Sequence, residues 1–216
     1  MSTPVQAAPS PERAWLLRAP LVLLRPRDVF AALRDESDEA VEARQEPVLA
    51  LILLSGVAAV LAAPIARGLL DDPATDGVVV AVWAFVGGFF YGTAGLWLGG
   101  ALVHGASQAL GGQGTYRRAR HVLAFAAAPV ALSLLTLWPL ALAAFGSGLF
   151  RSDGSGHALV GWGEAAFALW SLALLVTGIR AVHGWTWLRS LAAAALAAVG
   201  LAALFFGLEL LASLPD

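Results

Sequence analysis

The 216-residue chain contains no cysteine, no lysine and no asparagine, and it has only three isoleucines. Without cysteine it has neither a disulfide framework nor thiol chemistry. The missing residues use AT-rich codons, whereas alanine, glycine, leucine and arginine abound, so we infer a high-GC prokaryotic source. A net charge of −2 argues against nucleic acid as a partner.

Charge of either sign is also scarce. Charged residues make up 13% of the chain and hydrophobic ones 59%, whereas a soluble domain has about 25% charged residues. Residues 77–116 and 122–150 contain no Asp, Glu or Arg. Runs of about 20 apolar residues cross the hydrocarbon core of a bilayer. The sequence therefore predicts an all-α, polytopic membrane protein.

Five segments qualify as transmembrane helices, at about 47–66, 77–110, 119–146, 162–183 and 187–212. They must be helical because backbone polar groups find no water in the hydrocarbon core. The second segment is about 50 Å long as a helix, and the alternative is a hairpin at Gly87 and Gly88. Pro129 and Pro139 predict that the third span is kinked.

The arginines predict the orientation. Eleven of the thirteen lie in the tail 1–46, in the loop 111–120 and at the junction of the fourth and fifth spans. Only Arg67 and Arg151 lie in loops of the opposite parity. By the positive-inside rule, the N-terminus is cytoplasmic and the C-terminus external. In a prokaryote this places the chain in the plasma (inner) membrane.

The region before the first span has its own organisation. Residues 1–13 contain three prolines and no apolar run, which predicts a disordered tail without a cleavable signal. Within 14–46, Val29, Phe30 and Leu33 share one face of a helix started by Pro26. This helix is either amphipathic and interfacial or packed on the cytoplasmic side of the bundle. Residues 35–46 are expected to form an acidic, solvated linker.

Glycines crowd the second span, at spacings that place them on one helix face. Small residues let helix backbones approach closely in a bilayer. We therefore expect close helix packing, either within the bundle or against a membrane-protein partner or a second copy of the chain. The residues selected are Gly88, Gly92, Gly95 and Gly99.

Four polar residues in or near the spans are candidate functional groups. His104, His121 and His183 are all predicted near the cytoplasmic side, where converging imidazoles relay protons or hold a metal. Isolated interfacial histidines are the alternative, and no metal or other cofactor is predicted. Glu209 lies in the apolar stretch FFGLELLASL, where it is either a functional intramembrane acid or an interfacial one.

The turn GGQGTYRR at 111–118 is glycine-rich and basic, and it belongs to a loop predicted to be cytoplasmic, whose basic residues are Arg117, Arg118 and Arg120. It follows a membrane helix rather than a strand, so a nucleotide-binding role is not expected. Near anionic headgroups each arginine contributes about 1 kcal/mol of attraction. The sequence has no HExxH, GxSxG or Walker A motif, so no catalytic residue and no enzyme are predicted.

The order of these features resembles the Yip1 domain family of integral membrane proteins. RPRDVFAALRDE precedes a proline-started span (EPVLALILLSGV), LGGQGTYRRARHVLAFAAAPV leads into the third span, and WSLALLVTGIRAVHGWTW closes the fourth. The resemblance covers about 25–212 and implies a five-helix membrane domain, at 47–212, without established catalytic residues. Eukaryotic members contact Rab-type GTPases, but their aromatic-glycine-proline motif is absent here.

From these observations we expect a non-enzymatic membrane scaffold or partner-binding bundle. Its contact surface would be the cytoplasmic tail and the 111–120 turn. The alternative is a small transporter or permease component that moves a solute or lipid beside the kinked third span.

Overall fold

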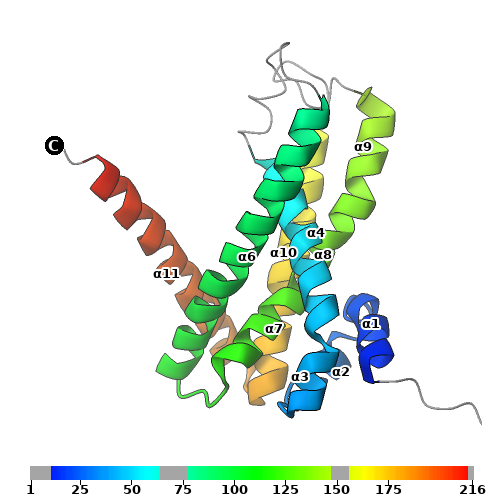
Figure 1. Cartoon of the computed structure of the whole chain (residues 1–216). Coiled ribbons are helices and arrows are strands. Elements are labelled where there is room, and N and C mark those ends of the chain that lie inside the picture. The colour runs from blue at the N-terminus through cyan, green and yellow to red at the C-terminus, as the bar shows by residue number, and fades with distance from the viewer. Residues whose placement is uncertain (1–10, 64–76, 147–155, 214–216) are drawn as a thin grey trace, which may run out of the picture.

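The computed structural model describes residues 11–63, 77–146 and 156–213, and over these residues it contains helices and no strands. Five helical segments are long and apolar enough to cross a membrane, as predicted. In chain order they are α4 (Gln45–Ala62), α6 (Gly77–Ala109), the broken helix α7–α9, α10 (His157–His183) and α11 (Trp187–Ala212). Figure 1 shows them as a bundle from which α11 diverges.

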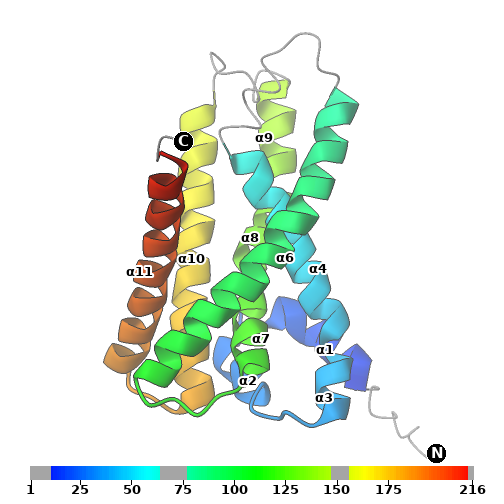
Figure 2. The same ribbon diagram turned by 60° about the vertical axis from the view of Figure 1, so that its left-hand side comes forward.

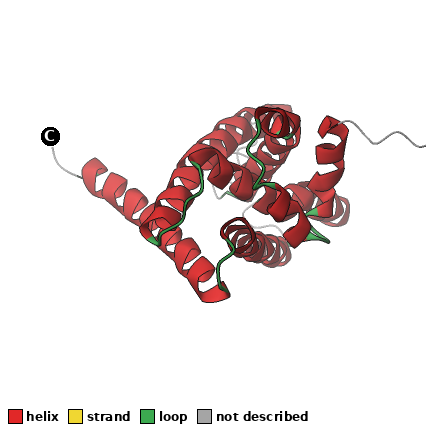
Figure 3. Cartoon of the chain, turned by 90° about the horizontal axis from the view of Figure 1, so that it is seen from below, coloured by secondary structure: helices red, strands yellow, loops and turns green. Residues whose placement is uncertain are grey.

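Three short helices precede the spans: α1 (Pro11–Leu21), α2 (Pro26–Ala32) and α3 (Asp38–Ala43). They lie at one end of the bundle, together with the turn after α6 and the junction of α10 and α11 (Figure 2). Viewed from that end, α11 extends outward from the other helices (Figure 3). We call this end, made of residues 11–44, 110–120 and 184–189, the arginine-rich end.

The second span is one continuous helix of 33 residues. This excludes the alternative in which Gly87 and Gly88 form a hairpin. At 1.5 Å per residue the helix is about 50 Å long, so it extends beyond a hydrocarbon core of about 30 Å.

The third span is broken twice, as its two prolines predict. It consists of α7 (Tyr116–Ala126), α8 (Ala128–Leu135) and α9 (Leu137–Phe145). Pro129 and Pro139 each lie in the first turn of a new segment, where a missing N–H costs no hydrogen bond. Near the second break, the Thr136 hydroxyl donates to the carbonyl of Leu132 at 2.8 Å and so satisfies a backbone acceptor.

Helices α4 and α6 cross in close contact at three glycines. A Cβ atom at Gly88 would lie 2.6 Å from the backbone nitrogen of Val57, and one at Gly92 would lie 2.5 Å from the carbonyl oxygen of Ile52. On α4 the matching position is Gly56, where an added Cβ atom would clash with the carbonyl oxygen of Gly88. This packing is within the bundle, and Gly56 was not selected from sequence.

The other two glycines selected from sequence do not take part in this crossing. A Cβ at Gly99 would meet the side chain of Leu123 on α7 at 2.8 Å. A Cβ at Gly95 would meet nothing within 4 Å. Close packing at Gly95 is therefore not found within the bundle, where this glycine is exposed; packing of Gly95 against a partner or a second copy of the chain stays a prediction.

The bundle itself covers the apolar face of α2. Val29, Phe30 and Leu33 are buried, and α2 packs on α10. Of the two interpretations of this helix, the second therefore holds for its apolar face, which packs on the bundle. Exposed leucines of this region lie on α1 instead, where Leu16 and Leu17 are 47% and 61% exposed, and in the turn after it, where Leu24 is 81% exposed.

The segment expected to be a solvated linker is partly helical and partly buried. Ser37 caps α3 by accepting a hydrogen bond from the backbone N–H of Ala40. Val41, Ala43 and Arg44 are buried. Because this segment has many acidic residues, its few apolar positions were not recognised from sequence as the ones that pack α3 against α1 and α4.

Candidate functional site

A fully buried arginine holds the arginine-rich end together. Arg44, between α3 and α4, has no exposed surface, although arginine is almost never fully buried unless it is paired. Its Nε donates to Nδ1 of His121 at 2.9 Å and its Nη1 to the carbonyl of Asp35 at 2.7 Å. The guanidinium lies 5.6 Å from the ring centroid of Trp15. One side chain thus connects α1, α3 and α7.

This hydrogen bond determines the tautomer of His121. Because Nδ1 accepts from Arg44, the ring proton of the neutral imidazole lies on Nε2. The side chain is buried, with 7% of its surface exposed. His121 is therefore a buried hydrogen-bond acceptor and not a solvent-exposed interfacial histidine.

Glu36 makes a second connection, to the start of α7. Its carboxylate pairs with the Arg118 guanidinium at 2.7 Å and also accepts from the hydroxyl of Thr115. Thr115 is the N-cap of α7 and accepts from the backbone N–H of Arg118 at 3.1 Å. A carboxylate at a helix N-terminus is favoured by the helix dipole, so the glycine-rich turn receives an internal partner.

Two further arginines bind carbonyl groups at helix ends. Nε of Arg34 donates to the carbonyl of Ala181 at 2.9 Å, near the end of α10. Nε of Arg189 donates to the carbonyl of Leu110 at 3.1 Å, just after α6. Cations are favourable at helix C-termini. The arginines that predict topology therefore also bind the helix ends to one another.

The basic turn divides into residues with different environments. The Arg118 side chain is 16% exposed, whereas that of Arg117 is 49% exposed and lies 4.0 Å from Asp38. The Arg120 guanidinium lies over two rings, 4.1 Å from the centroid of Trp97 and 4.9 Å from that of Tyr116. Only part of the turn is thus available to bind another molecule.

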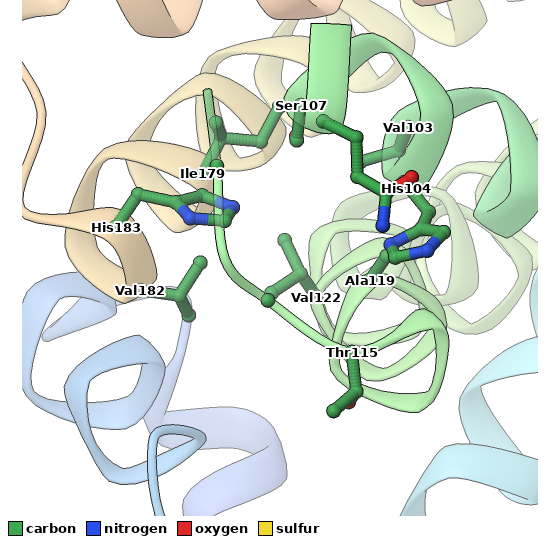
Figure 4. Close-up of a pocket in the computed structure, with 12 residues that line it drawn as sticks. Val103, His104, Ser107, Thr115, Ala119, Val122, Ile179, Val182 and His183 are labelled. Carbon is green, nitrogen blue, oxygen red and sulfur yellow. The ribbon is translucent and has the colours of Figure 1, made fainter. Parts of the chain in front are cut away.

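The three histidines do not form one cluster. His104 and His183 line the same small pocket, on opposite sides of it, together with Ser107 and Thr115 (Figure 4). His121 points elsewhere, to Arg44. Among the described residues, no group of three or more His, Cys, Asp or Glu side chains is arranged to hold a metal ion.

A carboxylate that was passed over in the sequence lies inside the fourth span. The Ser133 hydroxyl lies 3.1 and 3.4 Å from the two carboxylate oxygens of Glu164 on α10 and 2.8 Å from the carbonyl of Val130. Glu164 also accepts a hydrogen bond from the side chain of Trp138. Ser133 has no exposed surface and lies three residues before the break at Thr136. A paired intramembrane carboxylate is a functional candidate by default.

Glu209, which was selected from sequence, lies in a different setting. It is exposed on α11, close to the end of that helix. Glu164 was overlooked because it lies near the predicted start of its span, where an acidic residue normally marks the boundary. The signal in the sequence was a single acidic residue in the stretch GWGEAAFALW. The third span, which packs against this helix, carries hydroxyl side chains.

Comparison with known proteins identifies a family. The family model described as the Yip1 domain matches residues 21–208, which include α2, all of the spans except the last turn of α11, and the turn at 111–118. No curated protein and no solved structure matches the chain. The resemblance seen in the order of sequence features is therefore confirmed.

Proposed function

We propose that this chain, which belongs to the Yip1 domain family of membrane proteins, is a non-enzymatic scaffold that binds a partner protein through its arginine-rich end. The observation that carries the proposal is the bonding of α1–α3 onto the bundle. Arg44, Glu36 and Arg34 connect this segment to α7 and α10. The result is one surface built from segments that are distant in the sequence.

Such a surface suits recognition because its parts are already in place. A preorganised surface loses less conformational entropy when it binds. Arg34, Arg118 and Arg189 make internal contacts, whereas Arg25 and Arg27 are exposed at the same end. We therefore propose a partner with an acidic surface.

The test is copurification of the full chain from native membranes in mild detergent. The charge-reversal variant Arg25→Glu with Arg27→Glu should lose a partner that the unaltered protein retains. Glu209→Gln, which changes an exposed charge on α11, should retain it. An unchanged set of copurifying proteins in the charge-reversal variant would contradict the proposal.

We also propose that the arginine-rich end faces the cytoplasm of the plasma membrane. The chain has no cysteine, so single cysteines can be introduced without a background. Thr115→Cys should react only after the membrane is permeabilised, whereas Ser155→Cys should react in intact cells. The reverse pattern would invert the orientation.

One observation favours the alternative, a small transporter or permease component. Glu164 and Ser133 meet beside a broken span, and discontinuous helices line the substrate sites of many transporters. An apolar cavity of about 380 Å³ also lies between α4, α6, α10 and the α7–α8 break. Substrate-dependent flux in liposomes that Glu164→Gln abolishes and Glu209→Gln preserves would establish transport instead of the scaffold.

A further inference from the structure

A hollow of about 520 Å³ lies at the arginine-rich end, between α3 and α4 on one side and α6 and α7 on the other. Binding sites for small molecules have volumes of roughly 300–1,000 Å³, so the hollow has the size of a ligand site. It is polar at the end of the bundle and apolar where it follows the spanning helices. The two parts differ in chemistry.

The cationic groups of the polar part belong to α7. Arg120 lines the hollow, and among the described residues its buried Nε has no hydrogen-bond partner. Arg117 and His121 line it too, and the His121 proton lies on Nε2 because Nδ1 accepts from Arg44. Guanidinium and imidazole N–H groups that line one hollow are suited to phosphate recognition.

Acidic groups lie in the same hollow, on α3. Asp38 and Glu42 are four residues apart, so they share one face of that helix. Asp38 lies 4.0 Å from Arg117, but the two side chains are 106% and 49% exposed. An exposed pair of this kind contributes little energy, so both charges remain able to bind a ligand. A hollow with adjacent cations and acids matches a headgroup that carries both signs.

The apolar part belongs to the spanning helices. Leu49 on α4 and Trp97 on α6 line the hollow and are 61% and 52% exposed. Ile52 and Leu96 form its buried floor. Both helices are long and apolar enough to cross a membrane, and these exposed apolar side chains suit contact with acyl chains. Tryptophan is enriched at the level of lipid headgroups, which fits the polar part of the hollow to the membrane interface.

We propose that this hollow binds a phospholipid whose headgroup contains a phosphate and a primary ammonium, as in phosphatidylethanolamine. Arg120, Arg117 and the Nε2–H of His121 bind the phosphate. Glu42 and Asp38 accept hydrogen bonds from the ammonium, and an acyl chain lies along Leu49 and Trp97. This site is independent of the partner surface at Arg25 and Arg27.

The experiment is native mass spectrometry of the full chain in mild detergent, with phosphatidylethanolamine, phosphatidylcholine and phosphatidylglycerol added in equal amounts. The ethanolamine lipid should bind roughly tenfold more tightly than the choline lipid, because a quaternary ammonium has no N–H to donate to Glu42. Equal retention of all three lipids, or preferential retention of the glycerol lipid, would overturn the proposal.

Variants separate the two halves of the headgroup. Arg120→Gln should weaken all three lipids, whereas Glu42→Gln should abolish only the preference for ethanolamine over choline. Glu39→Gln is the matched control, because Glu39 is exposed on the same helix and does not line the hollow. If Arg120→Gln fails to fold, the exposed Arg117→Gln replaces it. A Glu42→Gln variant that behaves like Glu39→Gln would refute recognition of the ammonium.

Discussion

The crossing of α4 and α6 allows a test in which one substitution is made at two positions of the same helix. Gly88→Ala places a methyl group 2.6 Å from the backbone nitrogen and 2.7 Å from Cα of Val57. Gly95→Ala places the same group where no atom lies within 4 Å. Both changes remove a glycine from α6, so the gain in helix propensity cancels between them.

The expected magnitude follows from these distances. Ordinary contact begins at 3.4 Å, so the backbones must separate by roughly 0.8 Å, which forfeits about a quarter to a half of the local dispersion energy. Because the obstacle is backbone, no side chain can rotate to relieve it. Overpacking of this kind costs about 1–3 kcal/mol. Gly88→Ala should therefore be less stable than Gly95→Ala by about that amount.

Reversible unfolding in mixed micelles measures the difference, with thermal unfolding in detergent as a second readout. The double variant of Gly56→Ala and Gly88→Ala should cost less than the sum of its parts, because one separation of the helices relieves both clashes. If Gly88→Ala and Gly95→Ala are equally stable, the α4–α6 crossing is not the close contact described here. If Gly95→Ala instead changes the oligomeric state, the exposed glycine forms a seam between copies.

Three further predictions concern buried or paired polar groups. Arg44→Met should lower the free energy of unfolding by about 3 kcal/mol, through the loss of hydrogen bonds from a charged donor, and should raise hydrogen exchange in α1–α3 but not in α6; unchanged exchange would contradict the role of Arg44. Hydrogen bonds from the backbone N–H and then the hydroxyl of Ser37 hold the pKa of Asp35 below its usual 3.8. The resulting stabilisation is complete above pH 3.8 and is lost as the pH falls through the lower folded-state pKa, so Asp35→Asn should flatten the acid limb of a stability–pH curve. Ser133→Ala should destabilise the bundle by about 1–3 kcal/mol, because it removes a buried hydroxyl within hydrogen-bond distance of both Glu164 and the Val130 carbonyl; an unchanged midpoint of unfolding in mixed micelles would argue against a stabilising role of this hydroxyl.

The spans and their breaks could be predicted from sequence because each depends on local chemistry. Runs without charge mark the membrane helices, and the breaks in the third span follow from Pro129 and Pro139, whose effect extends over one helical turn. The glycine face of α6 was also visible. Its partner was not, because Gly56 lies in a segment without glycine spacing and only the helix crossing relates it to Gly88.

The contacts of the arginine-rich end could not be predicted, because they join residues that are distant in the sequence. Arg44 and His121 are 77 positions apart, and Glu36 and Arg118 are 82 apart. From sequence alone, Arg44 is one more charge in a segment that is expected to be solvated. No local sequence pattern distinguishes a solvated arginine on the cytoplasmic side from an arginine that is fully buried.

The burial of α2 also bears on the order in which the protein is completed during synthesis. Its neighbours on α10 follow late in the chain, and the hydrogen bond from Arg34 to Ala181 spans 147 residues. At 5–20 residues per second, the ribosome needs roughly 7–30 s to make that length. Throughout this interval the apolar face at Val29 and Phe30 has no cover from α10. Helix α2 is therefore synthesised well before the helix that covers it, and meanwhile it can be engaged by a chaperone or by the lipid surface.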